Sequence, residues 1–334
     1  MNGYPSRQSR PSGNPSAPIL RARARILEAI RSFFRDRGFC EVDPPIAVRY
    51  PNIDPNIFPV AISDPAGNRE TRWLHTSPEL SMKKLLAAGS GDIFFLGKVF
   101  RDREKSPLHA PEFTMLEWYR VGKPAEAVMR DVEELVRSLA GEFCDGGEIR
   151  REGTAVTLPD RWPRWEIEAA FRELLQVPLF NRDALFRALS SRGFRPAADE
   201  SWEELFHRAC LEAIEPEAAR RGGLFLTGYP AALAAMAKRR ADNPRLAERF
   251  EGFLAGIELV NGYEELTDPD EQEERLRELS ARHAEKTGQV LPIDPEFLAA
   301  LRKGLPPCSG AALGADRLAM LLLGAGSIDE IRIG

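Results

Sequence analysis

A carboxylate flanked by two aromatic rings is the feature of this chain that most clearly could do chemistry. Residues 112–121 alternate in a period of two, so Phe113, Glu117 and Tyr119 share one face of an expected strand. A buried carboxylate is costly unless it is paired with a cation or hydrogen-bonded. Glu117 therefore predicts a pocket floor that receives a positively charged group. The alternative is a hairpin in which Glu117 forms a salt bridge with a lysine or arginine of the same sheet.

Basic side chains at two other places suit a negatively charged ligand. Arg101 and His109 lie in and beside the charged loop that precedes this strand. Further along, small residues in 309–324 would let the backbone approach a ligand closely, and Arg317 follows them at the start of an expected helix. Positive charge there opposes the helix dipole, so an anion bound between Arg317 and the helix N–H groups would explain it. A local ion pair with Asp316 is the alternative.

These groups together predict a nucleotide site. Phe113 offers a ring on which adenine could stack, and the three basic side chains offer donors to phosphates. A further segment, residues 248–268, places carboxylates in an apolar stretch around Asn261, namely Glu251, Glu258, Glu264 and Glu265. Such a group requires cations, and Mg²⁺ held with nucleotide phosphates or a substrate ammonium would each be suitable. Simple surface acidity is the alternative.

Composition and charge narrow the class of protein. At 334 residues, with 43% hydrophobic and 29% charged residues, the chain has an ordinary globular composition and room for one large domain or two. No run approaches the roughly 18 apolar residues of a membrane span and no signal peptide is evident, which predicts a cytoplasmic protein. The net charge of −5 argues against a broad nucleic-acid-binding surface. Four scattered cysteines indicate neither a zinc site nor disulfides.

The elements that must position these residues follow from periodicity and from glycine and proline. Residues 1–18, rich in Ser, Pro, Gly and Asn, predict a disordered tail. Helices are expected at residues 20–38, 77–88, 125–143, 165–175, 182–191, 202–214, 269–286 and 315–323. Strands are expected at residues 39–46, 73–76, 92–101, 112–121, 224–229, 250–260 and 308–313. Strands scattered among helices, with few βαβ units, predict a mainly antiparallel sheet covered by helices, an α+β fold.

Long stretches of the chain resemble a known family. The helix and strand around Pro45 resemble motif one of the class II aminoacyl-tRNA synthetases of the lysyl type, residues 100–119 resemble motif two, and residues 314–323 resemble motif three. More closely, TSPELSMKKLL, HAPEFTMLEWYR, GIELVNGYEELTD and PPCSGAALGADRLAML resemble the lysyl-tRNA synthetase paralogues that modify elongation factor P. The resemblance implies an antiparallel β-sheet flanked by helices in a single catalytic domain, residues 19–334.

The resemblance also implies an ATP-dependent ligase. ATP and (R)-β-lysine, or lysine, would form an aminoacyl-adenylate, and the acyl group would pass to a lysine ε-amino group of elongation factor P. Motif one forms a dimer interface in this family, which implies a homodimer. Two alternatives are a truncated lysyl-tRNA synthetase-like enzyme that charges tRNA and a non-catalytic synthetase paralogue. The second would be expected to have lost its motif arginines and acidic residues.

Residue roles carry over at matching positions. Arg101 and Arg317 would be catalytic, and Phe113 would stack on adenine. The expected ATP-binding residues are Arg101, Glu104, His109, Phe113, Glu251, Glu258 and Arg317, of which Glu251 and Glu258 would hold Mg²⁺. Glu265 and Tyr119 would receive the side-chain ammonium of the substrate, and Glu79 its other amino group. The expected substrate-binding residues are Ser77, Glu79, Glu117, Tyr119, Asn261, Glu265, Ala312 and Gly314, with Asn261 at the carboxylate and Glu117 as a brace.

Departures from the family pattern distinguish this chain. Lysyl-tRNA synthetases carry an N-terminal OB-fold domain that grips the anticodon, whereas only the expected tail precedes motif one here, so no tRNA is expected as a substrate. Ala312 stands where those enzymes have glycine, and its methyl would crowd an α-amino acid and suit a β-amino acid. Arg103 stands where the family has a glutamate that reads the adenine amino group, and Ala110 replaces an asparagine. Both changes leave adenine recognition open.

Overall fold

The first helix sets the start of the folded chain. The computed structural model describes residues 15–333, apart from residues 64–66, 68–70, 152 and 157. Helix α1 (Ala17–Arg35) begins with Pro18 in its first turn, where the missing N–H of proline costs no hydrogen bond. The predicted tail of residues 1–18 is therefore too long by two residues. Residues 1–14 of that prediction lie outside the described part of the chain.

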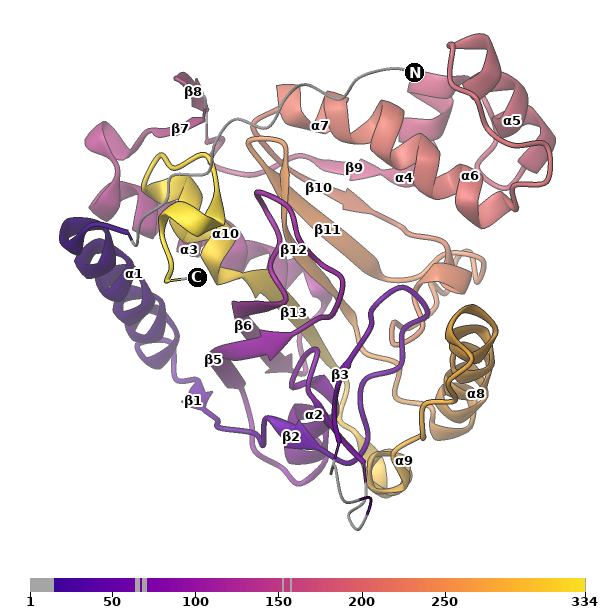
Figure 1. Cartoon of the computed structure of the whole chain (residues 1–334), viewed down its shortest axis with the longest axis horizontal. Coiled ribbons are helices and arrows are strands. Elements are labelled where there is room, and N and C mark those ends of the chain that lie inside the picture. Colours follow the sequence, from indigo (N-terminus) through magenta and orange to yellow (C-terminus); the bar gives the residue numbers. More distant parts are fainter. Residues whose placement is uncertain (1–14, 64–66, 68–70, 152, 157, 334) are drawn as a thin grey trace.

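An eight-stranded sheet forms the centre of the molecule (Figure 1). Its strands lie in the order β1 (Cys40–Glu41), β5 (Ile93–Phe100), β6 (Glu112–Val121), β13 (Cys308–Gly314), β12 (Ile257–Glu264), β11 (Arg249–Leu254), β10 (Gly223–Thr227) and β9 (Arg164–Glu166). Only the pairs at the two edges, β1 with β5 and β9 with β10, are parallel. The predicted α+β fold with a mainly antiparallel sheet is thus confirmed.

One face of the sheet is covered by helices α1, α3 (Ala125–Phe143) and α10 (Ala315–Leu322). Leu116 and Trp118 point to this face from β6 and are fully buried against those helices. Their neighbours Met115, Glu117 and Tyr119 point to the other face, as the alternation of the strand requires. The sheet therefore has one apolar face and one face that is free to carry polar groups.

Two groups of helices cover the ends of the second face and leave its middle to polar residues. Helices α2 (Glu79–Ala87), α8 (Pro269–Thr287) and α9 (Pro295–Gly304) pack at one end. At the other end, strands β9–β11 are covered by four helices, α4 (Ile167–Ala170), α5 (Arg182–Ser191), α6 (Trp202–Ala209) and α7 (Glu215–Arg220). Two π-helical turns, Phe171–Leu175 and Cys210–Ile214, belong to the same group. Smaller sheets join β2 (Ala47–Val48) and β3 (Val60–Ile62) to β4 (Arg72–Leu74), and β7 (Ile149–Arg151) to β8 (Thr154–Val156).

Parts of the structure differ from the elements expected from the sequence. The strand expected at 250–260 is a hairpin of β11 and β12, because Ala255 and Gly256 both have positive φ and form its turn. Trp165 lies in β9 rather than in the helix expected at 165–175, because its segment pairs with β10. Helix α9 was not expected, although Asp294 caps its first turn.

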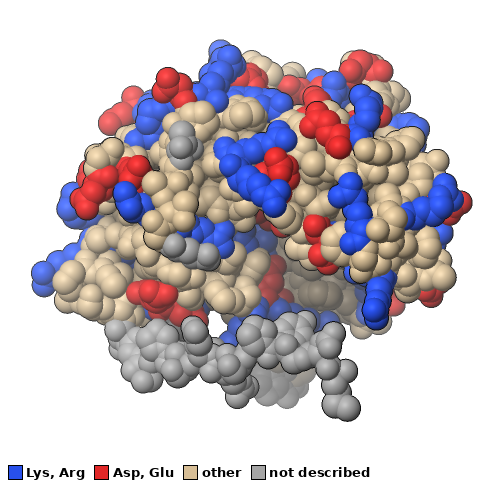
Figure 2. Space-filling model, turned by 90° about the horizontal axis from the view of Figure 1, so that it is seen from above, with Lys and Arg blue, Asp and Glu red and all other residues tan. Residues whose placement is uncertain are grey.

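Charged side chains are mixed over the molecular surface seen in Figure 2, where lysines and arginines alternate with acidic residues around a hollow. Among the described residues, no helix has the length and apolar character needed to cross a membrane.

Candidate active site

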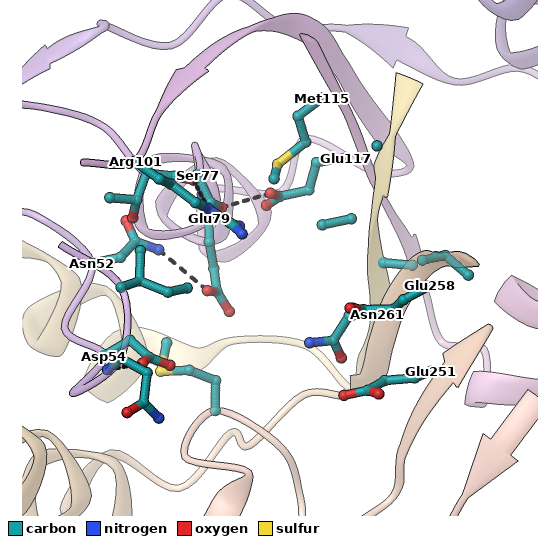
Figure 3. A pocket seen from close by; sticks show the side chains of 18 of the residues that line it. Asn52, Asp54, Ser77, Glu79, Arg101, Met115, Glu117, Glu251, Glu258 and Asn261 are labelled. Carbon is teal, nitrogen blue, oxygen red and sulfur yellow. Dashed lines mark hydrogen bonds between the residues drawn. The ribbon is translucent and has the colours of Figure 1, made fainter. Parts of the chain in front are cut away.

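A cavity of about 450 Å³ lies on the second face of the sheet. Its floor is formed by β6, β13, β12 and β11, and its rim by residues 52–57 and side chains of α6 and α8. All fifteen site residues expected from the sequence line it: Ser77, Glu79, Arg101, Glu104, His109, Phe113, Glu117, Tyr119, Glu251, Glu258, Asn261, Glu265, Ala312, Gly314 and Arg317. Figure 3 shows Glu251, Glu258 and Asn261 across the cavity from Ser77, Glu79 and Arg101. The fold thus brings together residues that are more than 200 positions apart in the sequence.

Strand register places the floor residues next to one another. Ala312 of β13 lies between Asn261 of β12 and Glu117 of β6. Two positions earlier, Gly310 lies beside Tyr119, and a Cβ at Gly310 would come within 2.4 Å of that ring. Glycine at 310 therefore lets the Tyr119 ring lie directly on the strand.

Glu117 is held by hydroxyl groups. Ser77 donates a hydrogen bond of 2.6 Å to one of its oxygens, and the Tyr119 phenol donates one of 2.8 Å to the other. Burial, followed by the neighbouring Glu79, raises the pKa of Glu117 to about 7. Among the described residues, no lysine or arginine forms a hydrogen bond or ion pair with Glu117, so the alternative of a salt-bridged hairpin is wrong.

Two further carboxylates share one buried lysine. Lys83 Nζ lies 2.7 Å from Glu79 Oε1 and 2.5 Å from Glu265 Oε2. The second contact is a short ion pair, so Glu265 Oε2 faces the Lys83 ammonium, whereas Glu265 Oε1 is buried without a hydrogen-bond donor among the described residues. Burial raises the pKa of Glu265 to about 8, although Lys83 acts in the opposite direction. Glu265 thus lines the cavity with one oxygen paired to Lys83 and one, Oε1, that has no donor in the described part of the chain.

Glu79 is fixed from several sides. Besides Lys83, Asn52 donates to its second oxygen over 3.3 Å, and the Tyr263 phenol donates to the first. Its backbone N–H donates to Ser77 Oγ over 3.0 Å, just before the start of α2. We call Glu79, Glu117, Glu265, Lys83, Tyr119 and Tyr263 the acidic cluster.

Arg317 is anchored by acceptors outside its own helix. Its guanidinium donates to the carbonyl oxygens of Leu108 and Glu258 and, over 2.6 Å, to His109 Nε2. Burial, then the positive charge of Arg317, lowers the pKa of His109, so the imidazole is neutral and accepts this bond. Asp316 instead pairs with Arg23 over 2.7 Å. The alternative in which Arg317 pairs with Asp316 is therefore wrong.

The loop after β5 turns Arg103 away from the cavity and Glu104 toward it. Arg103 has φ +64°, a left-handed conformation, and its side chain is 67% exposed and stacks over Phe58 at 4.4 Å. Glu104 lines the cavity near Arg101, whose guanidinium lies 5.2 Å from the centre of the Phe113 ring. The loop therefore presents a carboxylate to the cavity at position 104, one residue after position 103, where the family has its adenine-reading glutamate.

Glu251 and Glu258 are the carboxylates that suit a divalent cation. Glu251 accepts hydrogen bonds from Tyr229 and Arg249, and its pKa is raised to about 7 by burial and by the proximity of Glu258. Among the described residues, no group of three or more His, Cys, Asp or Glu side chains could hold a metal ion alone. Glu251 and Glu258 nevertheless fit a Mg²⁺ ion whose other ligands would be phosphates and water.

Sequence reasoning missed several polar residues of the site, and four of them contact expected site residues. Lys83 and Tyr263 belong to the acidic cluster, and Asn52 binds Glu79. Arg249 donates to Asn261 Oδ1 over 3.2 Å, which leaves the Asn261 amide N–H groups for a ligand. The only signal for Lys83 was its spacing of four from Glu79, which places both on one face of a helix.

Comparisons with known proteins found one family model and relatives of one name. A family model described as tRNA synthetases class II (D, K and N) matches residues 12–333. A curated relative from Yersinia pestis (strain Pestoides F), named elongation factor P--(R)-beta-lysine ligase, is 38% identical over 328 residues, which cover 96% of each chain. A relative of the same name from Yersinia pseudotuberculosis serotype O:1b (strain IP 31758) shows the same identity and coverage.

Proposed function

This chain belongs to the class II tRNA synthetase family (D, K and N), and on that premise we propose that it is an ATP-dependent ligase that attaches (R)-β-lysine, or lysine, to elongation factor P. The carboxylate of the amino acid attacks the α-phosphorus of ATP, and pyrophosphate leaves. The ε-amino group of a lysine on elongation factor P then attacks the adenylate carbonyl, and AMP leaves. No covalent bond to the enzyme is needed.

The observation that carries this proposal is Glu265, whose buried Oε1 has no hydrogen-bond donor among the described residues, in a cavity that also contains Arg101 and Arg317. A substrate ammonium supplies the missing donor. In the same cavity, the arginines supply the positive charge that phosphates require. An amino acid with a cationic side chain and a nucleotide can therefore be bound together.

Each residue contributes by position and charge. Glu265 and Tyr119 receive the ammonium of the side chain, Glu79 receives the other amino group, and Ser77 and Glu117 brace this part of the pocket. Asn261 donates to the substrate carboxylate, and Arg101 bridges that carboxylate and the α-phosphate. Such positioning and charge neutralisation account for the rate enhancement expected of the site.

The nucleotide part follows the same logic. Arg317 and His109 bind the outer phosphates, Phe113 stacks on adenine, and Gly314 packs against the stem of Arg317. Glu104 takes the place of the missing family glutamate at the adenine amino group. Glu251 and Glu258 would hold Mg²⁺, which neutralises phosphate charge when bound.

The finer points of the proposal concern the substrate and assembly. The methyl of Ala312 between Glu117 and Asn261 favours a β-amino acid over an α-amino acid. The relatives' name supports elongation factor P rather than tRNA as the acceptor. We extend the proposal to a cytoplasmic homodimer whose interface includes motif one.

ATP–pyrophosphate exchange tests the first half of the reaction. Exchange should depend on added (R)-β-lysine, and Arg317→Ala should reduce it by roughly 100-fold or more, because the variant lacks a donor to developing phosphate charge. Arg302→Ala, an exposed arginine that pairs with Glu273, is the matched control and should exchange normally. Near-normal exchange by Arg317→Ala would remove Arg317 from the mechanism.

A further inference from the structure

The acidic cluster contains a cation of its own, for which the proposed reaction provides no task. Lys83 projects from α2, and its side chain is 1% exposed. It contacts Glu79 and Glu265, the two carboxylates assigned to the two amino groups of the substrate. A lysine is almost never fully buried unless it is paired, so its placement depends on both partners.

The charges of the cluster can be counted from its members. Glu79, Glu117 and Glu265 carry three negative charges when ionised, and Lys83 cancels one of them, which leaves −2. A lysine-like amino acid carries two ammonium groups and would bring the cluster to neutrality. An amino acid with one ammonium group would leave one buried negative charge unpaired, which is unfavourable.

Lys83 also fixes the geometry of the two acceptors. It bridges one oxygen of Glu79 and one of Glu265, and so sets how far apart these carboxylates lie. Glu79 has further donors in Asn52 and Tyr263, whereas Lys83 is the only cation or donor that contacts the Glu265 carboxylate among the described residues. Without Lys83, no other described residue would hold the Glu265 carboxylate in place.

The other titratable groups around this pair are mostly acidic. Those that face Lys83 or Glu265 from packed elements are Glu79 on α2, Glu117 and Tyr119 on β6, Tyr263 on β12 and Cys308 on β13. Burial would lower the pKa of Lys83, but Glu265 and Glu79 together raise it above the ordinary value. Lys83 is therefore charged, and it opposes the increase that burial causes in the pKa of Glu265.

We propose that Lys83 is the positioning residue that makes this pocket selective for substrates with two ammonium groups, by bridging Glu79 and Glu265 and cancelling one of three negative charges. The inference rests on the proposed function, because it concerns how that same site binds its amino acid. Lys83 does not touch the reacting atoms and acts through the two carboxylates.

The first experiment compares Lys83→Met with Lys84→Met. Lys84 is the next residue of α2, pairs with Asp294 outside the cavity, and is the matched control. The kcat/KM for (R)-β-lysine in pyrophosphate exchange is measured between about pH 6 and pH 9.5, a range that brackets the raised carboxyl pKa values. For Lys83→Met we expect a loss on the order of 100-fold at neutral pH, mainly in KM, because one partner of a buried ion pair is removed.

The pH profile separates positioning from simple structural support. Loss of Lys83 raises the pKa of Glu265 further, so the acidic limb of the pH profile should move to higher pH by about one unit or more. Each unit of this shift corresponds to a tenfold loss of affinity for (R)-β-lysine on the acidic limb. The KM for ATP should stay within about twofold, because ATP does not contact the cluster. Lys83→Arg keeps the charge and should keep the wild-type limb even if its activity is lower.

A double variant keeps the test decisive if Lys83→Met is poorly folded. Lys83→Met with Glu117→Gln again carries −2, the same charge as the wild-type cluster, so it should fold. The charge count predicts that Glu117→Gln lowers kcat/KM in the wild-type chain but raises it in the Lys83→Met chain. The proposal would be overturned if the two substitutions lowered kcat/KM additively. It would also be overturned if the acidic limb of the pH profile did not shift in Lys83→Met.

Selectivity is tested with 3-aminohexanoic acid, which is β-lysine without its ε-amino group. Glu117→Gln alone leaves the acidic cluster with a charge of −1, so one of the two substrate ammonium groups has no carboxylate to pair with. The preference for (R)-β-lysine over this analogue should therefore fall by about tenfold. An unchanged preference would contradict the charge count. If the wild-type chain shows no exchange with either lysine, the proposed function fails instead, so the two failures are distinguishable.

Discussion

At the scale of single residues, the cavity separates its charges by task. Carboxylates and phenols are gathered around Lys83, and Arg317 is anchored to His109 near Glu258. Most of these groups are buried, and burial raises the pKa of Glu117, Glu251 and Glu265. Groups with shifted pKa values that gather in one cavity are typical of functional sites.

The side chain at position 312 should set the choice between α- and β-lysine. Ala312→Gly removes a methyl from the floor between Glu117 and Asn261, which makes room for an α-amino group. We expect the ratio of kcat/KM for α-lysine to that for β-lysine to rise about tenfold, the effect typical of one methyl group in a pocket. Pyrophosphate exchange with each amino acid measures this ratio, and an unchanged ratio would show that Ala312 is not the selector.

Glu104 should read the adenine amino group in place of the residue at 103. Glu104→Ala is expected to raise the KM for ATP, whereas the KM for GTP should change little. The preference for ATP over GTP should therefore fall by about tenfold, because one hydrogen bond to a charged group is lost. Arg103→Ala is the matched control, because the Arg103 side chain stacks on Phe58 outside the cavity. If Arg103→Ala relaxes base selectivity and Glu104→Ala does not, the assignment is reversed.

At the scale of elements, the floor depends on small residues in β13. Gly310 and Ala312 face the cavity from this strand, between the polar side chains of β6 and β12. Larger side chains there would fill the space in which Tyr119 and Glu265 lie. The strand is thus a spacer that keeps two polar strands apart without occupying the pocket.

Gly310→Ala tests this role. The new Cβ would lie 2.4 Å from the buried Tyr119 ring and 2.9 Å from Glu265 Oε1, so both groups must move. We expect KM for (R)-β-lysine to rise by roughly tenfold or more and stability to fall by about 1–3 kcal/mol, as for other overpacked sites. Gly141→Ala is the control, since its Cβ meets no atom within 4 Å and helix propensity favours alanine there. Normal amino-acid binding by Gly310→Ala would refute the spacer role.

Local patterns predicted those elements whose signals do not depend on distant partners. The bounds expected for the strand at 112–121 and the helices at 125–143 and 182–191 match the structure. The hairpin of β11 and β12 was missed because its turn, Ala255 and Gly256, lacks the usual polar turn residues between two apolar strands. Lys83 was missed because a lysine on a helix reads as solvent-facing until the strands that bury it are known.

At the scale of the whole molecule, the sheet separates stability from chemistry. Its apolar face packs on α1, α3 and α10, while the other face carries buried carboxylates that cost stability. Glu117 and Glu265 have raised pKa values, so the folded chain holds protons that the unfolded chain has lost. The stability that this proton binding contributes is fully present below the unfolded pKa of about 4.3. It is lost as the pH rises through the folded pKa values of about 7 and 8.

A pH series of urea unfolding checks this linkage. The free energy of unfolding of Glu265→Gln relative to wild type should increase between about pH 5 and pH 8, by at most about 1.4 kcal/mol per pH unit, because the variant has lost one titrating carboxyl. His75, His109 and His207 have lowered pKa values, but they are present in both chains and cancel in the difference. Parallel curves for the two chains would mean that Glu265 is ionised throughout this range.

The measurement that tests the central claim most directly is acyl transfer from one reaction mixture to two acceptors. The chain is incubated with ATP, Mg²⁺ and labelled (R)-β-lysine, together with elongation factor P and lysine-accepting tRNA, and the label on each acceptor is counted. We expect label on elongation factor P that depends on ATP, is stable to mild alkali as an amide must be, and is lost in Arg317→Ala. Label that appears only on tRNA as an alkali-labile ester, or on neither acceptor while adenylate forms, would contradict the account.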